Sequence, residues 1–187
     1  MPVVSITLLP GYDAETEQRL VHCVAQAVRS VIAVPAAGTM VFVTHANTYQ
    51  RDGRVRSSGG PAVPDAAAIV QDFLERMQSR DLDAAARHLA PGFAMHFPGT
   101  ATLHRLQDLL PWAAARYRRV AKTYTQIDQC WGDGNTVVYC AGTLHGEWLD
   151  GALFEGVRFI DRFEVADGLI YRQDVWNDLA EIRATTA

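Results

Sequence analysis

The spacing of apolar residues divides the first fifty positions into three predicted elements. Residues 3–9 are β-branched and leucine-rich, which predicts a buried strand. Asp13 is a good helix N-cap, and apolar residues recur at helical spacing over residues 20–31. Residues 40–44, MVFVT, form a second strand-like run. A strand, a helix of about twenty residues and a second strand predict a βαβ unit with parallel strands.

The pattern after residue 65 predicts helices first and a sheet afterwards. Helices are expected at residues 66–78, 81–89 and 103–120, the last one interrupted by Pro111, and a strand at residues 93–97. Four further strands are expected at residues 124–130, 136–145, 156–165 and 169–176, with hairpin turns at 132–135 and 166–168. This order predicts the α+β class with a curved antiparallel sheet.

Residues 51–65, RDGRVRSSGGPAVPD, are rich in glycine, proline and serine, which predicts a linker. The expected domains are therefore residues 1–50, the linker 51–65, and residues 66–187. A single βαβ unit is too small to bury a core alone. We therefore expect it to pair with a second copy or to pack on the larger domain.

Composition narrows the function classes. With 187 residues, 49% of them apolar, and a net charge of −4, the chain is typical of a globular protein that binds neither nucleic acid nor a membrane. No apolar run approaches the roughly 18 residues of a membrane span, and the N-terminus lacks the basic region of a secretory signal. We expect a cytoplasmic protein with a small-molecule partner. Three scattered cysteines predict neither a disulfide nor a zinc site, and the expected hairpin pairs Cys140 with Ile127 rather than with Cys130.

Pro2, the strand VVSITLL, Gly11, the helix and the strand MVFVT together resemble the tautomerase superfamily, in particular the 4-oxalocrotonate tautomerase group. The resemblance implies that Pro2, once Met1 is removed, acts as a catalytic base or nucleophile beside a carbonyl. Burial favours the neutral form of such an amine. Tyr12 and Met40 stand where this family places arginines, so a dicarboxylate substrate is not expected, and Tyr12 becomes a candidate substrate-binding residue.

The larger domain resembles the nuclear transport factor 2-like fold, near ketosteroid isomerase and the SnoaL-type polyketide cyclases. The resemblance is carried by IVQDFLERMQSRDLDAAARHLAPGF, by HFPG and by RFIDRFEVADGLIYRQDVWND. It implies a cone-shaped α+β barrel around an apolar cavity, without a cofactor or a metal. Tautomerase units pair and trimerise and the second fold dimerises, so the two resemblances together imply a homo-oligomer, either a dimer or a hexamer.

The ketosteroid isomerase resemblance gives three positions a role. Phe73 stands where that family has an oxyanion-binding tyrosine, and Phe97 where it has the catalytic aspartate. The second oxyanion donor, a protonated aspartate, is retained as Asp161. Strand alternation places Asp161 on the same face as Phe159 and Phe163. A carboxyl group against aromatic rings has a raised pKa, so it can stay neutral and donate a hydrogen bond.

Two residues are candidates for the missing base. His96 precedes Pro98 in the H-x-P-G pattern of many SnoaL-type proteins, although alternation turns it away from Phe97, and it is equally explained as a hydrogen-bonded residue at a strand end. Asp174 lies on the last strand, where cyclases of this fold carry an acid, but a shift of one residue reverses its face. Apolar and aromatic substrate-binding positions are expected at Phe73, Phe97, Trp112, Tyr139, Phe159, Phe163 and Trp176.

Two functions remain open. The first is an isomerase or polyketide-type cyclase that transfers a proton next to a carbonyl of an apolar, enolisable substrate. In one version Pro2 is the base; in the other, Asp161 works with His96 or Asp174 in the second domain, and the first unit only assembles the oligomer. The alternative is a non-catalytic module that binds a hydrophobic ligand, with the tautomerase-like unit serving only for oligomerisation. The two are distinguished by whether Asp161 and a second polar group converge within hydrogen-bond reach.

Overall fold

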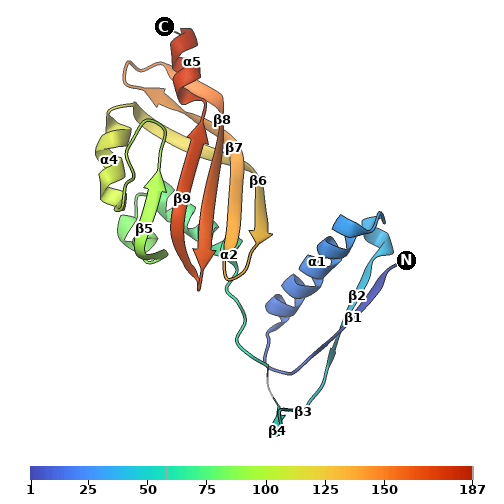
Figure 1. Ribbon diagram of the computed structural model, residues 1–187. Helices are drawn as coiled ribbons and strands as arrows, with labels where there is room; N and C mark the ends of the chain where they lie inside the picture. The colour runs from blue at the N-terminus through green and yellow to red at the C-terminus, as the bar shows by residue number, and fades with distance from the viewer. Residues whose placement is uncertain (58, 187) are drawn as a thin grey trace. The chain divides into compact units, whose positions relative to one another are not determined.

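The computed structural model describes residues 1–57 and 59–186 and divides the chain into two compact units, Met1–Ala62 and Val63–Ala187 (Figure 1). The first unit contains two two-stranded sheets and the second a five-stranded sheet. None of the helices in the described part of the chain is long and apolar enough to cross a membrane.

The first unit is built around two parallel strands and one helix. Strand β1 (Val3–Leu8) pairs in parallel with β2 (Met40–His45), and α1 (Ala14–Val31) and the short 3-10 helix η1 (Ala36–Gly38) connect them. The side chain of Asp13 caps α1 by accepting a hydrogen bond from the Thr16 amide at 2.8 Å. The parallel βαβ pairing expected from the hydrophobic pattern is thus observed. None of the eighteen described residues of α1 is fully buried.

A hairpin follows β2 where the sequence predicts the start of a linker. Strands β3 (Tyr49–Arg51) and β4 (Arg54–Arg56) pair antiparallel. Asp52 and Gly53 form the turn with φ angles of 51° and 71°. Two successive positive φ angles are typical of the type I′ turn, which favours Asp-Gly. The predicted linker therefore begins inside a hairpin, because Asp-Gly forms a tight turn as readily as a flexible connection.

The second unit carries helices around a five-stranded sheet (Figure 1). Its helices are α2 (Ala66–Gln78), α3 (Leu82–Ala86), α4 (Leu106–Ala114) and α5 (Leu179–Thr186). Its strands are β5 (Leu89–His96), β6 (Tyr117–Trp131), β7 (Thr136–Trp148), β8 (Leu153–Ala166) and β9 (Leu169–Asn177). The order is β5-β9-β8-β7-β6, with only the β5–β9 pair parallel. This is the mixed α+β class with a curved sheet that the sequence predicts.

One predicted boundary is wrong. Residues 117–120 open β6 instead of ending a helix, and α4 stops at Ala114 with Pro111 inside it. Tyr117 and Val120 are three residues apart, which favours a helix on spacing alone. In the structure a register shift near residue 118 lets both face the same side, Tyr117 opposite Trp148 and Val120 opposite Gly146. A β-bulge has reproduced a helical spacing within a strand.

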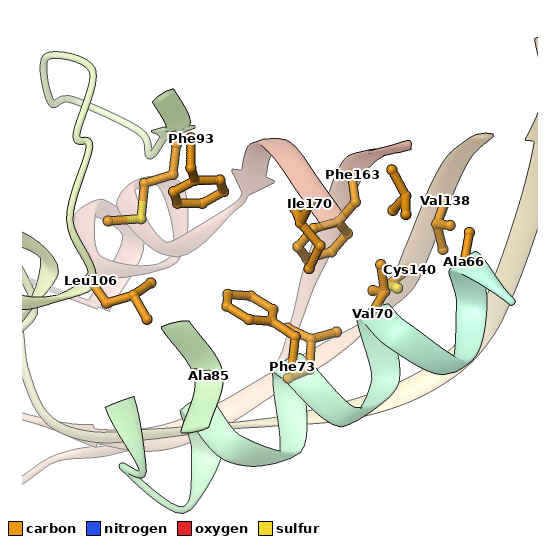
Figure 2. Close-up of a cluster of buried hydrophobic side chains, with 13 residues drawn as sticks. Ala66, Val70, Phe73, Ala85, Phe93, Leu106, Val138, Cys140, Phe163 and Ile170 are labelled. Carbon is orange, nitrogen blue, oxygen red and sulfur yellow. The ribbon is translucent and has the colours of Figure 1, made fainter. Parts of the chain in front are cut away.

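The core of the second unit lies between α2 and one face of the sheet, here called the inner face. Figure 2 shows Val70 and Phe73 of α2 pointing toward Cys140, Phe163 and Ile170. The Phe73 and Phe163 rings meet edge to face at 6.0 Å. Alternate residues of β8 from Val157 to Val165 are buried on this face. The pairing of Cys140 with Ile127 is also confirmed.

Gly142 and Gly146 alternate along β7 with the buried residues of the same face. A Cβ atom at either position would strike a backbone carbonyl oxygen of β6, that of Thr123 or of Arg119. The close approach of the two strands therefore requires glycine. It also leaves the middle of β7 without side chains at these two positions, so groups on β6 can reach across β7 to β8.

Candidate functional site

The inner face carries one buried ion pair. Asp161, in the middle of β8, has no exposed surface. Its Oδ2 atom is paired with Nζ of Lys122, which comes from β6 on the far side of β7. The Lys122 side chain remains 23% exposed. No group in the described part of the chain donates a hydrogen bond to the other oxygen of Asp161, Oδ1.

The pair is surrounded by apolar and weakly polar side chains. Cys140 lies directly opposite Asp161 on β7. Lys122 Nζ lies 4.6 Å from the centroid of the Phe159 ring, which Tyr124 meets edge to face at 5.7 Å. A cation held over an aromatic face in a dry site is stabilised by the ring as well as by its counter-ion.

Burial decides the protonation of this group of side chains. Desolvation raises the pKa of Asp161, and the charge of Lys122 opposes that rise only in part. Burial, reinforced by the charge of Asp161, raises the pKa of Cys140 to about 12 and raises that of Tyr124 as well. At neutral pH Cys140 and Tyr124 are therefore protonated. Asp161 is a carboxyl group with raised basicity and one oxygen free to meet a ligand.

A cleft of about 360 Å³ opens beside the same aromatic cluster. Trp148, Tyr117 and Leu179 line it, and they pack in one hydrophobic cluster with Phe159, the ring that contacts Lys122. The remaining lining residues are Pro98, Gly99, Trp112, Arg116, Asn177, Ala180, Glu181 and Arg183. The cleft thus adjoins the hydrophobic cluster that contains Phe159, whereas Lys122 and Asp161 do not line it.

His96 and Asp174 meet each other, but on the opposite face of the sheet. The β8–β9 register pairs Asp161 with Val175, so Asp174 faces away from Asp161. His96 Nδ1 lies 2.8 Å from Asp174 Oδ1 in an ion-pair contact rather than an aligned hydrogen bond. Arg162 and Arg172 also donate to Asp174, at 3.3 and 2.9 Å, which leaves this carboxylate 5% exposed and fully paired. The expected cooperation of Asp161 with either residue is therefore not found.

The predicted substrate-binding residues of the second unit divide between the two faces. Phe73, Phe159 and Phe163 are buried on the inner side. The Phe97 and Trp112 rings are in tilted contact, with centroids 5.0 Å apart, and Trp112 lines the cleft. Tyr139 and Trp176, 37% and 53% exposed, belong to the outer face, because their register partners are Arg162 and Ile160. The expectation that these two residues share a cavity with Asp161 is corrected accordingly.

The first unit holds the other two predicted residues. The Pro2 carbonyl accepts a hydrogen bond from the Met40 amide at 3.1 Å. The Tyr12 ring lies against Gly59, where a Cβ atom would come within 2.6 Å of it. Arg51, Arg54 and other residues of the β3–β4 hairpin line an open hollow of about 530 Å³.

Lys122 and its neighbours Tyr124 and Cys140 were not predicted as site residues. The sequence could have pointed to Lys122, because it is the single lysine beside sixteen arginines. No group of three or more histidine, cysteine or acidic side chains in the described ranges could hold a metal ion.

Comparison with known proteins agrees with the fold of the second unit. A family model described as a SnoaL-like domain matches residues 70–173. No curated protein sequence matches the chain. Among solved structures, NTF2-like proteins from Burkholderia pseudomallei and Burkholderia thailandensis are 19% and 18% identical, with TM-scores of 0.52 and 0.53. The chain is covered to 64% and 65% in these matches, and each of those proteins to 96%.

A putative ketosteroid isomerase from Shewanella frigidimarina is also similar in structure. It is 15% identical with a TM-score of 0.50, and the match covers 61% of this chain and 97% of that one. At these identities the likeness establishes the NTF2-like fold of the second unit.

Proposed function

The chain belongs to the SnoaL-like domain family, and on that premise we propose that it is an isomerase or polyketide-type cyclase that moves a proton next to the carbonyl of an apolar, enolisable substrate. One observation carries the proposal. A fully buried carboxyl group, Asp161, has one oxygen held by Lys122 and the other without a protein partner, on an aromatic-lined inner face.

In this proposal Asp161 is the base. Its carboxylate takes the α-proton of the substrate, so that the C–H bond breaks and an O–H bond forms. Lys122 lies on the same face and places a positive charge where the enolate oxygen develops. The protonated carboxyl then returns the proton to another carbon in an isomerase. In a cyclase, the enolate carbon first bonds to a second carbonyl carbon of the same substrate, and the resulting alkoxide takes the proton.

The raised pKa of Asp161 supports this role, since a more basic carboxylate is a better acceptor of a carbon-bound proton. The aromatic surroundings of the pair match an apolar substrate, and the cleft of about 360 Å³ adjoins the same hydrophobic cluster. Lys122 is a second polar group within ion-pair distance of Asp161. Two polar groups that converge in this way support an enzyme more than a purely apolar binding site.

The alternative is a binding module for a hydrophobic ligand. It is favoured by Phe73 and Phe97, which have no hydroxyl or carboxyl group where the ketosteroid isomerase resemblance would place them. In that case Lys122 and Asp161 would bind a ligand's polar end without any proton transfer. The two functions make different predictions for hydrogen exchange at carbon.

For the first unit we propose a tautomerase-like βαβ element that assembles the chain into a homo-oligomer. The exposed Val3, Met40 and Phe42 lie on one face of its two-stranded sheet, where a second copy would bury them. Catalysis by Pro2 additionally requires loss of Met1, which would leave a free secondary amine. Intact mass spectrometry of untagged protein tests this, because a retained Met1 leaves Pro2 as an amide and excludes it as a base.

The test of the main proposal is α-hydrogen exchange in D₂O. Apolar cyclic ketones such as 2-tetralone are incubated with wild-type protein and with Asp161→Asn, and deuterium incorporation is followed by NMR. We expect wild-type protein to accelerate exchange above the buffer rate and Asp161→Asn to lose about 100-fold of that acceleration. Binding of the ketone by both proteins without accelerated exchange would instead establish the binding module.

A further inference from the structure

The only lysine of the chain lies on the inner face, although arginine supplies every other basic side chain. Arginines in ion pairs range from largely exposed, as Arg158 is, to Arg162, whose side chain is 24% exposed and so as little exposed as that of Lys122. For charge alone, arginine would serve at position 122, because a guanidinium group pairs with carboxylates well. A primary amine can do one thing that a guanidinium group cannot do at ordinary pH, which is to lose its proton and attack a carbonyl carbon.

We propose that Lys122 forms a covalent imine with the carbonyl of the substrate, which makes it the nucleophile of this site and makes an aldehyde or ketone, not an ester or acid, its substrate class. This inference rests on the proposed function, because it assumes that a carbonyl compound reacts on the inner face. It extends that function because Lys122 forms a covalent bond to the substrate instead of acting only through its charge.

The contacts of Lys122 suit a nucleophile. Its Nζ atom is paired with a single carboxylate, that of Asp161, and otherwise lies over the Phe159 ring. The Asp161 carboxylate is thereby placed to accept the proton that Nζ must lose before it can attack a carbonyl carbon. The Lys122 side chain is 23% exposed, so this end of the pair is not sealed from solvent.

Asp161 can carry the protons that imine formation requires. The ammonium proton of Lys122 passes to the carboxylate, and the amine lone pair bonds to the carbonyl carbon, whose oxygen takes up that proton. The nitrogen of the resulting carbinolamine gives a proton to the Asp161 carboxylate. Asp161 passes this proton to the carbinolamine hydroxyl group, which leaves as water. A C=N bond has then replaced C=O, and one water has been released.

The imine makes the adjacent C–H bond more acidic once its nitrogen is protonated. The Asp161 carboxylate removes the α-proton to give an enamine, whose carbon then takes a proton or bonds to a second carbonyl carbon. Addition of the released water to the C=N bond reverses the first stage and frees Lys122. No oxidant, reductant or further reactant is needed. The fully buried position of Asp161 beside Lys122 places one acid–base group within reach of both stages.

Borohydride trapping tests the inference with little ambiguity, since the printed sequence offers only two amino groups, the Lys122 side chain and the N-terminal amine. Wild-type protein is incubated with 2-tetralone and reduced, and the modified peptide is located by mass spectrometry. We expect a mass gain equal to the ketone minus one oxygen atom, on the peptide that contains Lys122. An adduct confined to the N-terminal amine would overturn the inference.

Two variants serve as matched controls. Lys122→Arg keeps the positive charge beside Asp161 but cannot form the adduct, so we expect trapping on this peptide to disappear. Arg119→Lys adds an exposed lysine to the same strand, and we expect at least about tenfold less adduct there than at Lys122, because this position lacks the buried Asp161 carboxyl group that carries the protons. Equal modification of both lysines would show ordinary chemical reactivity and would overturn the inference.

Failure of the imine and failure of the proposed function give different results. Accelerated α-exchange without an adduct, retained by Lys122→Arg, would overturn the imine and leave proton transfer by Asp161 in place. An adduct on Lys122 without accelerated exchange would support the imine and overturn the proton transfer. Neither exchange nor an adduct would overturn both. As a readout that needs no variant, protein labelled with ¹³C-lysine gives one side-chain signal set, which imine formation should shift.

Discussion

The two faces of the five-stranded sheet each bury one aspartate, and the two carboxyl groups have opposite surroundings. Asp174 on the outer face is paired with His96, Arg162 and Arg172. Within the described residues, Asp161 on the inner face is paired with Lys122 alone and has one oxygen that receives no hydrogen bond. They are thirteen positions apart, and their strands are neighbours.

A buried carboxyl group can therefore either stabilise the fold or be available to react with a ligand. A carboxylate that two guanidinium groups and a histidine contact has its hydrogen-bonding capacity filled by protein, so it contributes to structure. A carboxyl group in an apolar interior with one unfilled oxygen is costly for the fold. Such a group is retained where a ligand supplies the missing partner, and we assign the reactive role to Asp161 for this reason.

The largest expected effect is on reactivity. Asp161→Asn should lower acceleration of α-exchange about 100-fold, whereas Asp174→Asn should change it less than about threefold, because only Asp161 faces the interior. Exchange rates measured for both variants under identical conditions compare the two faces directly. A larger loss in Asp174→Asn, with its fold intact by circular dichroism, would reverse the assignment.

The second effect concerns aromatic residues on the two faces. Phe159→Ala removes a buried ring from the inner face and should lower the free energy of unfolding by about 3 to 5 kcal/mol. Trp176→Ala removes a half-exposed ring from the outer face and should cost about 0.5 kcal/mol or less. Urea denaturation of both variants measures the difference. Similar costs would mean that the outer face is covered in solution.

For stability, the order of the two variants should be reversed, with the larger loss of unfolding free energy in Asp174→Asn. Asp174→Asn weakens the charge-assisted bonds from Arg162 and Arg172, which should cost about 1 to 2 kcal/mol. Asp161→Asn should cost less, because it removes the desolvation of a buried carboxylate and because Lys122, 23% exposed, can turn its charge toward solvent. Chemical denaturation at pH 7 is the measurement, and a greater loss for Asp161→Asn would show that its ion pair mainly stabilises the fold.

The smallest effect is a change in pH dependence. Because burial raises the pKa of Asp161, the folded state binds its proton more tightly than the unfolded state does. Its contribution to stability is therefore greatest below the ordinary aspartate pKa of about 4 and falls as the pH rises toward the raised value. Asp161→Asn lacks this loss. Its melting temperature relative to wild type should improve from pH 4 to pH 7, and a constant difference would contradict the raised pKa.

The sequence predicted the inner face better than the residues that act on it. The alternation of Phe159, Asp161 and Phe163 predicts their shared face, which the structure reproduces. The face of Asp174 could not be predicted, because it depends on a register that only strand pairing determines. Lys122 was missed because the bulge near residue 118 imitates a helix, so residue 122 fell between a predicted helix and a predicted strand and received no face.

The most direct test is a crystal structure of the protein with 2-tetralone bound and reduced in place. We expect the ligand on the inner face, bonded to Lys122, with its α-carbon next to Asp161 and its rings against Phe159. A ligand bound instead at His96 and Asp174 on the outer face would contradict the assignment of the reaction to the buried pair.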